Sequence, residues 1–138
     1  ESREALEADT ALKARIEAIR LIAGPMMNLG DVAAKSVPKM TLVSAPVRGG
    51  TISTRSFIPH RAHASIGVFA AVSVASACTL PGSPAAALAQ LPRDGRFAIE
   101  HPSGAAEVLL ERDAGGRVTR AGTLRSARKL FDGRVFPR

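Results

Sequence analysis

The sequence contains few aromatic residues and a single cysteine. Its 138 residues include five Phe but no Trp or Tyr. Proteins that bind single-stranded nucleic acid without sequence preference stack the bases on aromatic side chains, so this composition argues against such a platform. One Cys excludes both a disulfide within the chain and a Cys-rich zinc module. The low cysteine content makes the cytoplasm the expected compartment. No charged segment followed by a small-residue cleavage site opens the sequence, so we expect no signal peptide.

The composition is that of an ordinary folded domain. Hydrophobic residues make up 46% and charged residues 22%, and 138 residues fit one domain. The 12 Gly and 9 Pro favour many short elements over a helical bundle. A net charge of +7 suggests polyanions or small acidic molecules as partners. The chain begins with Glu1 rather than Met, so we expect a processed chain or a piece of a longer one.

Residues 3–23 have the pattern of one amphipathic helix. Ser2 is a suitable N-cap, and acidic residues crowd the first turns, where the helix dipole favours them. Apolar residues recur at the helical spacing of a buried face, at Leu12, Ile16, Ile19 and Ala23, while Arg20 lies elsewhere on the wheel. Gly24-Pro25 predicts the end of the helix.

Short strands separated by turn residues are expected over most of the remaining chain. Residues 26–38 have no clean period and predict a loop. The predicted strands cover residues 40–44, 51–58, 97–100, 106–112, 117–123 and 135–136, with a short helix at 85–90. The fold class is therefore α+β, a curved and mostly antiparallel sheet around a buried helix, with the first helix packed outside.

The buried helix is predicted from the uncharged run 64–80. A membrane span needs about 20 strongly apolar residues, whereas this run contains several Ser and Thr and ends at Pro81-Gly82. A helix that is apolar on every side and rich in small residues is typical of the interior of a protein. The sequence thus predicts no membrane span.

The junction between the second strand and this helix, residues 57–65, is the best candidate site. A helix that begins at Ala62 or His63 would present free backbone N–H groups and a positive dipole end to a carboxylate. Small side chains would let a ligand approach, and Ser65 could add a hydroxyl donor. The alternative is that a Ser or His merely caps the helix. The candidate substrate-binding residues are Arg55, His60, Ala62, His63, Ala64 and Ser65.

Other side chains with potential chemistry carry weaker signals. The pair His60 and His63 could bind a metal, but a zinc site needs a third ligand and none lies nearby in the sequence. His101 has the context of a turn residue, without a local group to orient it as a base. Cys78 falls at the far end of the apolar helix and is expected to be a buried hydrophobe rather than a nucleophile.

The C-terminal part of the chain is strongly basic. A nucleic-acid-binding stripe is one interpretation. Without interleaved aromatics or a known motif, we favour exposed strand edges protected by charge, together with long-range attraction for acidic ligands. The basic residues are Arg117, Arg120, Arg125, Arg128, Lys129, Arg134 and Arg138.

Several motifs, in this order along the chain, resemble a known family. They are Leu29-Gly30-Asp31-Val32, Val37-Pro38-Lys39, the run from Gly49 to His60, His63-Ala64-Ser65, Ala77-Cys78-Thr79-Leu80-Pro81-Gly82, His101-Pro102-Ser103-Gly104 and Arg125-Ser126-Ala127-Arg128-Lys129-Leu130. Together they resemble the C-terminal half of the PrpF family of isomerases and tautomerases. That family includes methylaconitate isomerase, methylitaconate isomerase and 4-oxalomesaconate tautomerase.

The resemblance implies a diaminopimelate-epimerase-like fold, in which two similar domains enclose the active site. Residues 1–138 would form a single domain, the C-terminal half of the isomerase, and the N-terminal domain of the same protein would be its partner. A half of such a cleft should expose an apolar face and tend to associate, so a homodimer is a further expectation.

The resemblance also implies the chemistry, an allylic proton shift on an unsaturated di- or tricarboxylate without cofactor or metal. The principal base and acid, a lysine and a cysteine, belong to the N-terminal half, so this chain alone should be inactive and its catalytic residues are unknown. Relatives often carry Cys at the position of Ala62. A non-catalytic carboxylate-binding or interaction domain is the alternative function.

Overall fold

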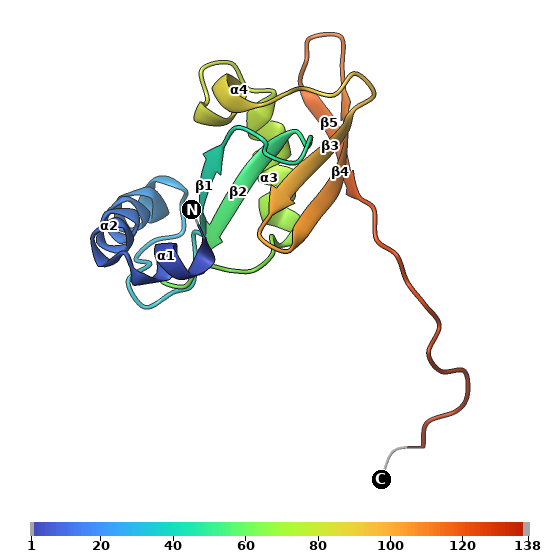
Figure 1. Ribbon diagram of the computed structural model, residues 1–138, viewed down its shortest axis with the longest axis horizontal. Coiled ribbons are helices and arrows are strands. Elements are labelled where there is room, and N and C mark those ends of the chain that lie inside the picture. Colours follow the sequence, from blue (N-terminus) through green and yellow to red (C-terminus); the bar gives the residue numbers. More distant parts are fainter. Residues whose placement is uncertain (1, 137–138) are drawn as a thin grey trace.

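A five-stranded mixed sheet forms the centre of the molecule in the computed structural model, which describes residues 2–136 (Figure 1). The strands lie side by side in chain order, β1 to β5. All neighbours are antiparallel except β2 and β3, which are parallel. A parallel pair needs a long crossover, and α3 and α4 provide it. The predicted α+β class and mostly antiparallel sheet are confirmed.

The elements follow the predicted order. They are α1 (Arg3–Ala8), α2 (Thr10–Met26), β1 (Met40–Ser44), β2 (Ile52–Phe57), α3 (Val68–Cys78), α4 (Pro84–Leu88), β3 (Arg96–His101), β4 (Gly104–Arg112) and β5 (Val118–Thr123). The loop predicted at 26–38 and the strand predicted at 40–44 are confirmed almost to the residue, because Gly and Pro mark these boundaries locally.

Strand β2 is buried on both faces because helices pack against each of them. Ile52 belongs to the main core, which α3 forms with β3 and β4. Phe57 has the opposite parity and packs in a second cluster with Leu6 of α1 and Ile16 of α2. The sheet therefore has α3 on one face, and α1 and α2 on the other at the end of β2.

The single helix predicted over 3–23 is wrong in two respects. Asp9 divides it, because its side chain accepts a hydrogen bond from the N–H of Leu12 at 2.8 Å and caps α2. The helix also continues past Gly24-Pro25 to Met26, with Pro25 in its last turn. Arg20, expected on the solvent side, is fully buried.

The helix predicted over 64–80 is shorter and less buried than expected. It begins at Val68, with Gly67 as its N-cap, and ends at Cys78. One face packs on the sheet, whereas Phe69 on the opposite side is 89% exposed. Within this chain the sheet covers one side of α3 and does not wrap around it. Cys78 is buried as predicted, and burial raises the pKa of its thiol to about 11.

An apolar groove runs along the uncovered side of α3. Its volume is about 630 Å³. Phe69 and Ala70 of α3 lie on one side, and β1, α4 and the loop that follows α2 complete the lining. The sequence resemblance predicted an exposed apolar face, and this groove is such a face.

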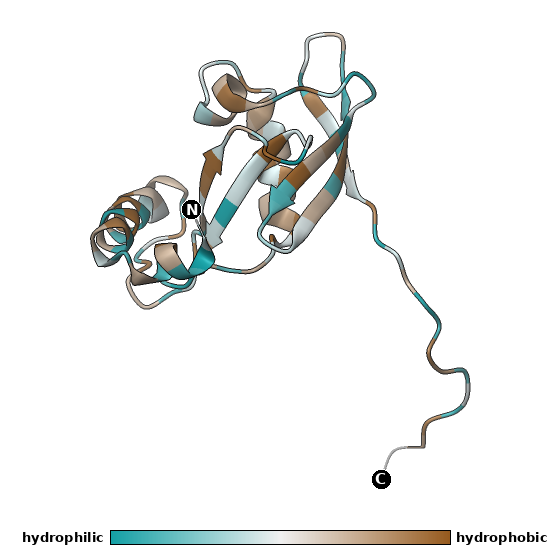
Figure 2. Ribbon diagram, viewed as in Figure 1, coloured by the Kyte–Doolittle hydropathy of each residue, from teal (hydrophilic) through white to brown (hydrophobic). Residues whose placement is uncertain are grey.

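The strand predicted at 135–136 does not form. After β5 the chain continues to residue 136 as an irregular segment that leads away from the sheet (Figure 1). Figure 2 shows hydrophilic and hydrophobic residues mixed along it, without the alternation of a strand. Most of the basic residues named above lie here, where Lys129 pairs with Asp132 at 2.5 Å. Arg138 lies outside the described residues.

Glu100 holds the loop between β1 and β2 against β3. Its buried carboxylate accepts hydrogen bonds from the backbone N–H groups of Val47, Arg48 and Gly50 at 2.8–2.9 Å. Gly50 permits this approach, since a Cβ there would lie 2.7 Å from Cγ of Glu100. Burial by itself raises the pKa of Glu100, but the three donors and the nearby guanidinium of Arg48 outweigh it and lower the pKa.

We expect Glu100→Gln to destabilise the fold by about 2–3 kcal/mol at neutral pH, because an amide cannot accept all three bonds. A lowered pKa in the folded state stabilises the protein above the unfolded pKa, and this contribution is lost as the pH falls through the folded value. The difference in unfolding free energy from the wild type should therefore narrow below about pH 4. Urea unfolding of the wild type and Glu100→Gln, at neutral pH and below about pH 4, measures this difference in free energy. Glu111→Gln, at an exposed position, is the control. An equal loss of unfolding free energy in both variants would contradict the stabilising role given to the hydrogen bonds of Glu100.

Candidate functional site

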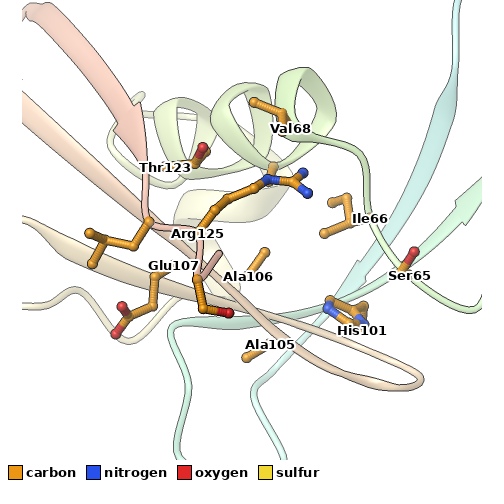
Figure 3. Close-up of a pocket in the computed structure, with 12 residues that line it drawn as sticks. Ser65, Ile66, Val68, His101, Ala105, Ala106, Glu107, Thr123 and Arg125 are labelled. Atoms are coloured by element: carbon orange, nitrogen blue, oxygen red, sulfur yellow. The ribbon is translucent and has the colours of Figure 1, made fainter. Parts of the chain in front are cut away.

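A cleft of about 380 Å³ opens where α3 begins. The segment leading into α3, the end of β3, strand β4 and the residues that follow β5 surround it (Figure 3). These parts are distant in the sequence and adjacent in space because β3, β4 and β5 are neighbours in the sheet. The lining residues are Ser65, Ile66, Val68, Ala71, His101, Ala105, Ala106, Glu107, Thr123, Leu124, Arg125 and Ser126.

The start of α3 gives the cleft a set of backbone donors. The first N–H groups of a helix have no partner within it, and Gly67, the N-cap, has no side chain to supply one. Ser65 is exposed at the cleft, and its neighbour Ile66 is buried in the main core and anchors the segment. This end of a helix also carries the positive pole of its dipole. The arrangement is suited to an anionic ligand.

Arg125 adds a cation to the same cleft. Figure 3 shows its guanidinium extending toward the start of α3, near Val68 and Ile66. Glu107, an acidic residue of the lining, points away from it. A guanidinium can bind a carboxylate through two parallel hydrogen bonds. Arg125 and the N–H groups of α3 can therefore act on one carboxylate.

His101 lies on the other side of the cleft, at the end of β3. Its Nδ1 is 3.2 Å from Oγ of Ser103, and that hydroxyl donates to the carbonyl oxygen of Ala64 at 2.7 Å. Burial lowers the pKa of His101 and nearby Arg48 lowers it further, while the carbonyl of Ala64 opposes the shift. The ring is therefore neutral at physiological pH.

The predicted helix start at Ala62 or His63 is wrong. The N–H of Ala62 donates to the carboxylate of Glu7, and the N–H of His63 donates to the carbonyl of Ser56 at 2.8 Å. These groups are occupied because residues 57–63 fold back on β2, where Ala62 pairs with Phe57. The open N–H groups occur at Gly67 and beyond, about one helical turn later.

Of the six candidate substrate-binding residues, Ser65 alone lines the cleft. Ala62 is buried in the second core cluster, while His63 and Ala64 are exposed between that cluster and Ser65. Arg55 lies in a smaller pocket against Leu6, where it donates to the carbonyl of Thr54 at 2.8 Å.

His60 lies beside α2 rather than at the cleft. Its Nδ1 is 3.6 Å from a carboxylate oxygen of Glu17. Within residues 2–136, no three His, Cys, Asp or Glu side chains come close enough together to hold a metal ion.

Sequence reasoning did not place His101 and Arg125 at this site. Each lies in one of the motifs that carry the family resemblance, and this was the available signal. Neither has a chemical partner nearby in the sequence, because their common site is formed by strand pairing.

The comparisons with known proteins agree with this fold. The family model described as PrpF protein matches residues 1–137. The chain belongs to the PrpF family. It is 59% identical over 138 residues to a protein named (4E)-oxalomesaconate Delta-isomerase from Novosphingobium sp., and 59% identical over 136 residues to 4-oxalomesaconate tautomerase from Pseudomonas putida. These matches cover 99% and 96% of the chain but 39% and 37% of the two relatives, so it spans well under half of their length.

A solved structure resembles this PrpF chain as well. The crystal structure of methylitaconate-delta-isomerase aligns with a TM-score of 0.75 over 90% of this chain and 40% of that one, at 16% identity. At this identity the likeness establishes the fold alone. No helix among the described residues of this PrpF chain is long and apolar enough to cross a membrane.

Proposed function

We propose that this chain is the carboxylate-binding part of an isomerase that shifts a proton along an unsaturated di- or tricarboxylate. The observation that carries the proposal is the guanidinium of Arg125 beside the uncapped start of α3, in one cleft with Ser65. The relatives named as oxalomesaconate isomerase and tautomerase support this class of substrate.

The first step is the binding of one substrate carboxylate. In this proposal Arg125 and the N–H groups after Gly67 hold the carboxylate, and the hydroxyl of Ser65 donates to it. Charge-assisted bonds of this kind are about twice as strong as neutral ones. The bound carboxylate is conjugated with the reacting double bond, so the same donors also stabilise the negative charge that develops when a proton leaves.

The proton transfers need a base and an acid close to the substrate. The resemblance implies a lysine and a cysteine for these roles, in a part of the protein that this chain does not include. Ala62, at the position where relatives often carry Cys, packs in the second core cluster and does not line the cleft. We therefore assign it no part in proton transfer.

The longer relatives suggest what covers the open faces. The PrpF relatives have more than twice the length of this chain, and we propose that a second domain of a diaminopimelate-epimerase-like fold closes the cleft from the opposite side. It would also cover the apolar groove beside Phe69. A homodimer that uses the same groove remains a separate prediction.

Proton NMR in D2O tests the proposed reaction. Oxalomesaconate, methylitaconate and aconitate would be incubated with the 138-residue chain and, separately, with the product of the whole reading frame that contains it. We expect deuterium to enter the allylic position with the longer protein only, because this chain lacks the base and acid.

Two results would redirect the proposal. A folded longer protein that exchanges no proton in any of these acids would overturn the isomerase. If it binds the acids without exchange, the non-catalytic carboxylate-binding domain becomes the better conclusion.

A further inference from the structure

The hydrogen atoms around Ser103 determine the tautomer of His101. The hydroxyl and the backbone N–H of Ser103 both reach the carbonyl oxygen of Ala64, at 2.7 and 3.0 Å. A carbonyl oxygen can only accept, so the single hydroxyl hydrogen of Ser103 is used in that bond. Oγ must then accept the hydrogen bond from Nδ1 of His101, 3.2 Å away. The neutral ring therefore carries its hydrogen on Nδ1, and Nε2 keeps a free lone pair.

The charges around this ring maintain the neutral form. Arg48 donates to the carbonyl oxygens of His101 and Gly104 at 2.5 and 2.8 Å, and Arg125 lines the same cleft. Glu107 is the acidic residue of the lining, and it points away from Arg125 (Figure 3). With the guanidinium of Arg48 near it and partial burial, the ring offers an acceptor rather than a donor at neutral pH.

We propose that His101 selects ligands that carry a hydroxyl or enol hydroxyl in addition to the bound carboxylate, with Nε2 accepting the hydroxyl hydrogen. The inference rests on the proposed function, since Arg125, Ser65 and the start of α3 place the carboxylate. A second carboxylate oxygen at this position would bring one lone pair against another, whereas a hydroxyl donates a hydrogen bond. Ser103 is the positioning residue that keeps Nε2 unprotonated. The preferred substrate class is thus a hydroxylated or enolic unsaturated polycarboxylate.

Malate and succinate are suitable probes because they differ by one hydroxyl. Ligand-observed NMR titrations would measure the Kd of both acids with the product of the whole reading frame. At about pH 8 we expect malate to bind roughly three- to tenfold more tightly than succinate, the size of one neutral hydrogen bond. A second titration at lower pH, below the pKa of His101, should find the ring protonated and Nε2 acting as a donor, so the preference should fall to within about twofold.

Two variants separate the hydroxyl contact from carboxylate binding. His101→Phe keeps a ring but has no acceptor, so the preference for malate should disappear at both pH values while succinate still binds. The same variant is the control for protonation of malate and succinate at low pH, because any change in binding that this protonation causes remains in His101→Phe. Ser103→Ala removes the oxygen that accepts the hydrogen bond from Nδ1 of His101, so either ring nitrogen can carry the hydrogen. The preference for malate should then weaken, while succinate still binds. Ser44→Ala, an exposed hydroxyl outside the cleft, should leave it unchanged.

Each result of these titrations either supports or overturns the role of His101. A wild-type preference for malate that is lost at low pH and in His101→Phe supports the inference. Equal binding of both acids, or a preference that persists in His101→Phe, overturns it while the proposed function stands. If neither acid binds at any pH, the carboxylate site itself fails, and the inference fails with it. If a variant does not fold, the comparison of malate with succinate on the wild type at about pH 8, where both acids are fully ionised, still tests the inference, because equal binding there overturns it.

Discussion

Replacing Arg125 with Gln should weaken the binding of a dicarboxylate such as fumarate by about tenfold or more, because hydrogen bonds to charged groups are the strong ones. The guanidinium extends toward the start of α3, where the ligand carboxylate is proposed to lie (Figure 3). Ligand-observed NMR titration of wild type and variant measures the change. Arg125→Lys should recover part of the affinity, since it restores the charge but not the planar fork.

Arg128 is the matched control for this prediction. It lies three residues further along the same exposed segment and does not line the cleft. Arg128→Gln removes the same charge and should change the Kd by less than about twofold, since exposed charges at a distance are screened. If both variants lose affinity equally, Arg125 acts through the overall positive charge and not through contact with the ligand.

Replacing Arg20 with Met should lower the Tm by roughly 10 °C or more. The buried guanidinium donates to the carbonyl oxygens of Val32, Lys35 and Val37 at 2.9, 3.1 and 2.6 Å, and two further bonds join it to Glu17. Met removes every donor and leaves these carbonyl oxygens without their partner. Thermal unfolding followed by circular dichroism measures the effect.

Two further variants define the cause. Arg15→Met lies on the same helix but is exposed, and it should change the Tm by no more than one or two degrees. Arg20→Lys should recover little, because an ammonium group has three donors and cannot reproduce the planar geometry of a guanidinium. A stable Arg20→Met would mean that the loop 32–37 holds its conformation without these bonds.

Helix α2 shows why the polar pattern of a helix is an incomplete guide to burial. The spacing assigned Arg20 to the solvent side and Ile19 to the core. In the structure Arg20 is fully buried, and Ile19 is 55% exposed. The loop after α2 folds back over the helix and offers carbonyl oxygens to Arg20. Helical periodicity alone cannot reveal this partner, since the acceptors lie 12 to 17 residues further along the chain.

Features that depend on neighbouring residues could be predicted from the sequence. Turn residues marked most strand boundaries, the uncharged run identified the central helix, and ordered motifs identified the family. Glycine, proline and capping side chains act over a few residues, so their effects can be predicted from a short window. The α+β class followed from these elements alone.

The location of the site, in contrast, depends on how distant segments pack together. The sequence predicted a helix start at Ala62 or His63, whereas α3 begins at Val68, because the residues before it pair with β2 and bond to α1. The cleft exists because strand pairing brings Ser65, His101 and Arg125 together from three distant segments. Which backbone donors remain free, and which tautomer a histidine adopts, depends on hydrogen bonds between residues far apart in the sequence. No local pattern specifies those bonds, and they appear once the sheet is assembled.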